Sequence, residues 1–362
     1  MDFGLSEEQV LFKDTLRRFL DAECPTTRVR SIMESPDGHD PVLWSALARL
    51  GVTGLVVPPE QGGAGLDILD AALAAEELGR ACTPGPYLGA TMAAVALADC
   101  EPSEVTARWL AGLASGETLI TFALGEGTGQ WDAAALTTRA AGDTLSGAKS
   151  LVPAATVADA IVVSAIDDDG PGLWLVERGS RGVEVLPLKG TDMTRRVDAL
   201  RLTQAPAIKL ASGRRASDRA RDAGLVMLAA DAYGGSIRCL EMTRDYALTR
   251  EQFGQVIGAF QGVKHQLADL ATELEPACSL WWYAAHALDQ IPEDAARHAA
   301  LAKALLSDLY DRAVRVAIEL HGGIGFTWEF DLHLWFRRAM FDRAFLGEAS
   351  YHRERAATLA GW

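Results

Sequence analysis

The most specific pattern in the chain lies in two segments: residues 244–261 read RDYALTREQFGQVIGAFQ, and residues 319–329 read ELHGGIGFTWE. Between them runs an apolar stripe with helical spacing, which stops at Gly322-Gly323, as expected where glycine ends a helix. The stripe consists of Leu301, Leu305, Leu309, Ala313, Val316 and Leu320. We therefore expect this part of the chain to be helical.

Outward from these segments, the chain divides into three blocks of different pattern. Helical signals begin at Ser6, which opens a capping box, and give way at Gly116 to short β-type runs. The clearest runs are Leu119–Leu124, Ala160–Ile166, Leu173–Glu177 and Gly182–Leu188, with a hairpin turn expected at Asp167–Gly172. We expect an α+β multi-domain fold: an N-terminal helical domain (1–115), a middle antiparallel β-barrel or sandwich (116–212) and a C-terminal four-helix bundle (213–362).

Composition excludes several classes of function. The 362-residue chain has a formal net charge of −15, which argues against a nucleic-acid or anionic-membrane partner. Its five cysteines are scattered and never at CxxC spacing, so neither a disulfide framework nor a metal site is expected. The acidic start, MDFGLSEEQV, is not a signal peptide, and no apolar run could span a bilayer. We expect a soluble, cytoplasmic protein.

The two opening segments together resemble the C-terminal domain of the acyl-CoA dehydrogenases, flavoenzymes that desaturate acyl-CoA thioesters. A Gly/Pro-rich stretch, GVTGLVVPPEQGGAGL at 51–66, and the helix expected from Asp67 to about Arg80 resemble the N-terminal domain of the same family. The resemblance implies FAD as cofactor, an acyl-CoA thioester as substrate and an electron-transfer flavoprotein-type acceptor. It also implies an oligomer in which FAD lies between two subunits.

In that family, one subunit holds the flavin ring and its neighbour reaches across to the diphosphate and adenine. The residues that match the reaching-across half are Arg250, Gln252, Phe253, Phe260, Gln261, Glu319, Gly322 and Gly323. The forked, permanently charged guanidinium of Arg250 suits a diphosphate. Glu319 stands where the family usually has glutamine, and its carboxylate would repel a diphosphate unless it is protonated or turned away.

The ring-holding half departs further from the family pattern. The segment LGEGTGQWD at 124–132 keeps the glutamate, but the family threonine has become Gly125. In GAKSLVP at 147–153, the tryptophan that packs on the flavin is replaced by Leu151, and the threonine that bonds the ring by Pro153. Proline has neither a hydroxyl nor a backbone N–H to offer. We expect this half to be a poor flavin site.

The general base is missing from both places where the family carries it. Those positions fall on Leu346 and, for a minority of members, Gly224, and neither can take a proton. The catalytic residue is therefore unknown, with three carboxylates as candidates: Glu348, Asp222 and Asp231. Each has the pattern of a solvated or capping group more than that of a base in a dry pocket. His321 and His333 are expected to pack rather than to react.

The match in the reaching-across half of the flavin site, together with the losses in the ring-holding half, predicts that two related chains share the functions of the site. The first hypothesis is that this chain is the non-base-bearing subunit of a heteromeric acyl-CoA dehydrogenase, for example α2β2, whose related partner subunit supplies the ring contacts and the base. The alternatives are a self-sufficient homo-oligomer with a relocated base, and a non-catalytic scaffold that binds a CoA ester or flavin.

Overall fold

The computed structural model describes residues 4–129, 131–132, 135–211 and 213–362. The first three residues of the expected N-terminal helical domain, Gln130 of the 124–132 segment and Ser212 at the end of the expected middle domain lie outside this set. The N-terminal part contains α1 Glu7–Glu23, α2 Thr26–Glu34, α3 Pro41–Arg49, short 3-10 turns at Val52–Gly54 and Pro59–Gln61, α4 Ile68–Arg80, α5 Tyr87–Ala98 and α6 Glu104–Ser115.

Local caps set where these helices begin. Ser6 Oγ accepts from the backbone N–H of Gln9 at 3.2 Å, and the Gln9 side chain accepts from the Ser6 N–H at 3.0 Å, so the predicted capping box forms. Helix α2 was not predicted from the sequence pattern. That helix begins directly after Pro25, which stands at its N-cap, because proline suits the start of a helix as well as ending the one before.

The middle part is an eight-stranded sheet. Its strands are β1 Ile120–Ala123, β2 Arg139–Ala141, β3 Thr144–Pro153, β4 Ala160–Asp167, β5 Gly170–Glu177, β6 Val183–Pro187, β7 Val197–Pro206 and β8 Ile208–Leu210. The sheet is antiparallel for the most part, but β4 pairs in parallel with both β1 and β2, which the sequence pattern did not predict. The expected hairpin forms between β4 and β5, where Asp167 pairs with Gly170.

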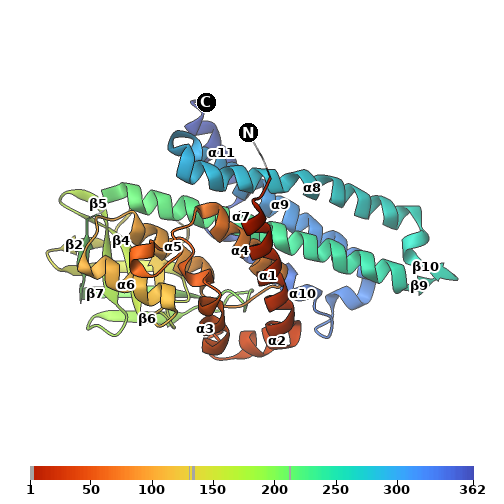
Figure 1. The fold of residues 1–362 in the computed structure, drawn as a ribbon, viewed down its shortest axis with the longest axis horizontal. Coiled ribbons are helices and arrows are strands. Elements are labelled where there is room, and N and C mark those ends of the chain that lie inside the picture. Colours follow the sequence, from red (N-terminus) through yellow and green to blue (C-terminus); the bar gives the residue numbers. More distant parts are fainter. Residues whose placement is uncertain (1–3, 130, 133–134, 212) are drawn as a thin grey trace.

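The C-terminal part consists of α7 Gly213–Thr249, α8 Gln261–Gln290, α9 Pro292–His321, α10 Leu332–Ala344 and α11 Ala349–Leu359. A small hairpin, β9 Glu251–Gln252 and β10 Gln255–Val256, and a 3-10 turn at Ile257–Ala259 join α7 to α8, and another 3-10 turn, Gly322–Phe326, follows α9. The hairpin lies at the opposite end of the molecule from the β-sheet (Figure 1). The expected order of a helical, a β and a second helical part is confirmed, with α11 as a fifth helix packed on α9.

One buried arginine joins all three parts. Arg338 of α10 is fully buried and donates to Asp192 and Thr194 in the β6–β7 connection, to Asp231 of α7, and to the carbonyl of Thr83 after α4. Because the partners come from all three parts, these bonds fix the middle of α7 against the N-terminal and β parts. Within the described residues, no helix is both long and apolar enough to cross a bilayer.

Candidate functional site

The predicted cofactor residues lie together at the free ends of α7 and α9. Residues 246–261 and 319–330, which we call the tip, form this region. Arg250 is exposed at the end of α7, and its side chain has no hydrogen bond or ion pair among the described residues. Its backbone carbonyl accepts from Ile257 N at 2.7 Å, which closes the loop around the β9–β10 hairpin. Phe253, in a left-handed conformation at the hairpin turn, is 93% exposed.

The diglycine faces open space at the end of α9. Gly322 has φ 66° and ψ −144°, a conformation for which glycine is suited and side-chain-bearing residues are not. A Cβ added at Gly322 or Gly323 would meet no atom within 4 Å, so a ligand could approach the backbone closely. Glu319 is exposed one turn earlier, without an ion pair among the described residues.

The remaining predicted contacts belong to the loop that enters α8. Gln252 is exposed and donates to the carbonyl of Glu251 at 2.7 Å, and Gln261 is exposed at the start of α8. Phe260 is half-buried, with its ring centroid 6.2 Å from that of Phe253. All eight predicted cofactor residues are thus reachable from outside the chain.

Sequence reasoning missed the apolar surface that accompanies these groups. Phe326 is 77% exposed, and Leu248, Ile324 and Trp328 are also exposed. Apolar side chains exposed together at one end of a chain are typical of a surface that a partner covers. The sequence signal for this surface is Phe326 and Trp328 in ELHGGIGFTWE, whereas the family resemblance points only to Glu319 and the two glycines as contacts.

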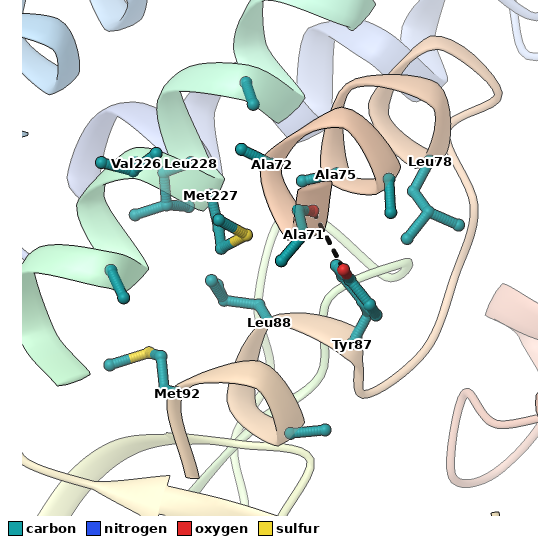
Figure 2. Close-up of a cluster of buried hydrophobic side chains, with 14 of the residues drawn as sticks. Ala71, Ala72, Ala75, Leu78, Tyr87, Leu88, Met92, Val226, Met227 and Leu228 are labelled. Atoms are coloured by element: carbon teal, nitrogen blue, oxygen red, sulfur yellow. Dashed lines mark hydrogen bonds between the residues drawn. The ribbon is translucent and has the colours of Figure 1, made fainter. Parts of the chain in front are cut away.

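The two family positions for the base meet in space, and both are apolar. Leu346 is 1% exposed with φ 60°, in the turn after α10. A Cβ added at Gly224 of α7 would lie 2.9 Å from Leu346 Cδ1 and 2.8 Å from Met92 Sδ. Figure 2 shows Met92 and Leu88 of α5 in the same buried cluster as the neighbouring residues of α7. No proton acceptor stands at either position.

Aromatic side chains close the β-domain side of the same region. A Cβ added at Gly125 would lie 2.5 Å from the Trp131 ring, which packs edge-on against Phe345 with centroids 5.2 Å apart. The carbonyl of Pro153 accepts from Thr121 Oγ1 at 2.6 Å, and Leu151 has φ 54° in an irregular stretch of β3. We call Met92, Trp131, Phe345 and Leu346, all buried, the apolar plug.

The kept glutamate of this half supports the β domain. Glu126 is buried and accepts from Lys149 Nζ at 2.7 Å and from the hydroxyls of Thr137 and Thr138 at 2.6 and 2.7 Å. Burial acts to raise the pKa of Glu126, but the Lys149 ammonium and these hydroxyls outweigh burial and lower it to about 2. Burial lowers the pKa of Lys149 to about 8. A carboxylate this acidic and this fully bonded is a poor general base.

The three candidate carboxylates have different surroundings, and each is either paired or exposed. Asp231 is buried and receives both Arg338, at 2.8 Å, and Arg195, at 3.0 Å. Asp222 pairs with Arg221 at 3.0 Å and with Arg355 at 2.8 Å, beside an open cavity of about 520 Å³. Glu348 is exposed at the start of α11. A general base requires an unpaired carboxylate in a dry pocket, whereas two of these carboxylates are held in ion pairs and the third is open to solvent.

Both histidines are packed. His321 Nδ1–H donates to the carbonyl of Ala317 at 2.7 Å, and its ring stacks on Tyr246. The His333 ring stacks on Trp328 with centroids 4.5 Å apart. Burial lowers the pKa of His321 and of His333, so both rings are neutral near pH 7.

Comparison with known proteins agrees with this arrangement of parts. The family model described as acyl-CoA dehydrogenase, N-terminal domain, matches residues 6–117, and that of the C-terminal domain matches residues 211–359. Acyl-CoA dehydrogenase IpdE2 of Mycobacterium tuberculosis is 34% identical over 338 residues, covering 92% of this chain and 91% of that protein. IpdE2 of Mycolicibacterium smegmatis is 32% identical over 345 residues, covering 95% and 96%.

Solved structures give the same assignment. A variant of the Tcur3481-Tcur3483 steroid ACAD superimposes with a TM-score of 0.91 at 32% identity, covering 98% of each chain. The ChsE4-ChsE5 complex from Mycobacterium tuberculosis superimposes with a TM-score of 0.91 at 28% identity, covering 100% of this chain and 99% of that one. The chain therefore belongs to the acyl-CoA dehydrogenase family, whose members are FAD-dependent oxidoreductases.

Proposed function

We propose that this chain is the non-base-bearing subunit of a heteromeric FAD-dependent acyl-CoA dehydrogenase. The observation that carries the proposal is the contact of Leu346 and Met92 at Gly224. One place that could hold the base carries the buried side chain of Leu346, and the other is Gly224, which has no side chain, so the α-proton of an acyl-CoA thioester has no acceptor at either. A related partner chain supplies the base and the contacts to the flavin ring.

The tip supports the second half of the proposal. Arg250 and the diglycine suit a diphosphate, because they offer a free guanidinium and open backbone at an exposed chain end. The β-domain side of this chain does not suit a flavin ring, since Trp131 covers Gly125 and Pro153 donates nothing. We therefore assign to this chain the cross-subunit FAD contacts and no step of the reaction itself.

The comparisons favour a two-chain assembly. Two of the similar structures are named as pairs of chains, Tcur3481-Tcur3483 and ChsE4-ChsE5, and the first is called a steroid ACAD. By analogy we propose an α2β2 complex in the cytoplasm, acting on a bulky acyl-CoA such as a steroid-derived thioester. An electron-transfer flavoprotein-type acceptor would reoxidise its FAD.

Isolation of the native assembly tests the proposal. The chain, tagged and expressed in the organism it comes from, should purify with a related acyl-CoA dehydrogenase chain, and the complex should be yellow. The same chain expressed alone should be colourless. Stoichiometric FAD and acyl-CoA-dependent dye reduction from the chain alone would contradict the proposal and favour a homomeric enzyme.

Substitution at the tip tests the division of roles. Arg250→Ala should weaken FAD binding by the complex about 10- to 150-fold, the equivalent of the 1.5–3 kcal/mol that a charge-assisted hydrogen bond contributes. Arg244→Ala is the matched control, because Arg244 is exposed on the same helix and paired with Asp245. Equal FAD retention by both variants would favour the scaffold interpretation.

A further inference from the structure

Two stacked rings join the two halves of the tip, and neither belongs to the residues expected to touch FAD. Tyr246 lies on α7, and His321 is the last residue of α9; their ring centroids are 4.3 Å apart at an interplanar angle of 24°. The Tyr246 hydroxyl donates to the His321 carbonyl at 3.4 Å. Phe330 completes the cluster, with its ring 4.8 Å from that of His321 and 6.4 Å from that of Tyr246.

Each ring is tied to one of the segments that carry the polar groups. The N–H of Arg250 donates to the Tyr246 carbonyl at 2.8 Å, which places the tyrosine one helical turn before the arginine. His321 directly precedes Gly322, and its own ring is fixed by the bond from Nδ1–H to Ala317. A shift of one ring against the other therefore changes the separation between Arg250 and the diglycine.

The stack lies at the C-terminal ends of α7 and α9, where few other side chains hold the two helices together. α7 and α9 pack along much of their length, but Leu248, Thr249, Arg250 and Glu319 in their last turns are all exposed. Helix ends without buried contacts fray, because their terminal carbonyls and N–H groups have few partners. His321 is 4% exposed, so the stack is a buried contact at this end of the helix pair, together with the buried side chains of Ala247 and Ile318.

We propose that Tyr246 and His321 are positioning residues, whose stacked rings hold the Arg250 loop and Gly322-Gly323 at the separation that one diphosphate can bridge. This inference rests on the proposed function, since it assumes that both segments meet the same FAD. The rings themselves touch no cofactor. They lower the cost of binding by ordering the two segments beforehand.

The test uses the native assembly purified through this chain, with FAD as the probe. Tyr246→Leu removes the ring, whereas Tyr246→Phe keeps the stack and loses only the hydroxyl. Tyr283→Leu is the matched control, because Tyr283 is a half-exposed tyrosine of α8 outside the tip. FAD dissociation is followed by the rise of free-flavin fluorescence on dilution, and the melting temperature of each FAD-stripped complex is recorded beside it.

We expect Tyr246→Leu to release FAD at least about tenfold faster than the wild type, while Tyr246→Phe and Tyr283→Leu stay within about twofold. The melting temperatures of the stripped complexes should not separate Tyr246→Leu from Tyr283→Leu. Equal release by the two leucine variants, or equal loss in the Leu and Phe variants, would overturn the positioning role. A stripped complex of Tyr246→Leu that melts early would assign the effect to folding instead. Failure of the wild-type assembly to contain FAD would contradict the proposed function itself.

Discussion

The tip and the apolar plug, which the proposed function assigns to two parts of one flavin site, have opposite surroundings. At the tip, Arg250, Phe253 and the diglycine are exposed and make few contacts within the chain. At the plug, Leu346 and Met92 are buried against Gly224, and Trp131 against Phe345. The tip is built as a surface that something else must complete, whereas the plug is built as hydrophobic core.

This difference contrasts what a catalytic pocket requires with what a stable core requires. A catalytic pocket must keep a cavity and a charged group, and both cost free energy of folding. Here leucine and glycine stand at the base positions, and apolar side chains fill the space around them. The comparison predicts that changes around the plug lower the stability of this chain, whereas changes at the tip affect only binding.

The largest loss should come from breaking the buried ion pair beside the plug. Glu126→Gln would leave the Lys149 ammonium, whose side chain is 0% exposed, without its counter-charge, and we expect a loss of about 3–5 kcal/mol in the free energy of unfolding. The glutamine amide would also face the N–H and hydroxyl groups of Thr137 and Thr138, which are themselves donors. Urea denaturation followed by tryptophan fluorescence measures the change.

Glu184→Gln is the matched control for this prediction. Glu184 pairs with Arg201 at 2.7 Å in the same sheet, but both side chains are more than half exposed. Exposed ion pairs contribute only about 0–1 kcal/mol, so this variant should unfold almost like the wild type. Equal effects at Glu126 and Glu184 would show that the buried pair is not a structural support.

A smaller loss in the free energy of unfolding should follow from truncating a side chain of the apolar plug. Leu346→Ala would leave a cavity beside Gly224 and Met92, at a cost of about 2–5 kcal/mol. The control is Leu305→Ala on α9, whose side chain is 37% exposed and should cost little. If Leu346→Ala were as stable as Leu305→Ala, the region would be a loosely filled pocket rather than core, and the comparison with the tip would fail.

Much of the fold could be predicted because its signals are local. The capping box at Ser6, the start of α4 after Asp67 and the hairpin at Asp167–Gly170 each depend on neighbouring residues. The parallel pairing of β4 with β1 and β2 could not be predicted, because it depends on contacts distant in sequence. The stripe on α9 has the expected spacing, but Leu301 and Leu305 are partly exposed within the single chain.

The family motifs single out residues for the candidate site, but they do not predict how these residues pack. Family motifs identified Arg250 and the diglycine, and they showed that Leu346 and Gly224 cannot act as bases. No pattern showed that these last two residues touch, that Met92 fills the space between α5 and α7, or that Tyr246 stacks on His321. Such contacts join separate helices, and their geometry follows from the tertiary fold alone.

The smallest of these effects should be a pH dependence of the free energy of unfolding, caused by a histidine that contacts the turn carrying Leu346. His352 is 1% exposed, and its Nε2–H donates to the Leu346 carbonyl at 3.0 Å. Burial, with the nearby positive charges of Lys303, Arg355 and Arg221, lowers the pKa of His352 from 6.5 to about 3. The folded chain therefore keeps this ring neutral at pH values where the unfolded chain protonates it.

The sign of the effect follows from this difference in proton binding. Above pH 6.5 neither state binds the proton and the contribution of His352 is fully present; as pH falls from 6.5 toward 3, it is lost by up to about 1.4 kcal/mol per pH unit. His352→Gln keeps a donor for the Leu346 carbonyl but cannot titrate. The free energy of unfolding of the wild type should thus fall more steeply than that of His352→Gln between pH 6.5 and pH 5. Parallel curves would mean that the ring is not held neutral, and that the turn beneath the plug is open to water as the tip is.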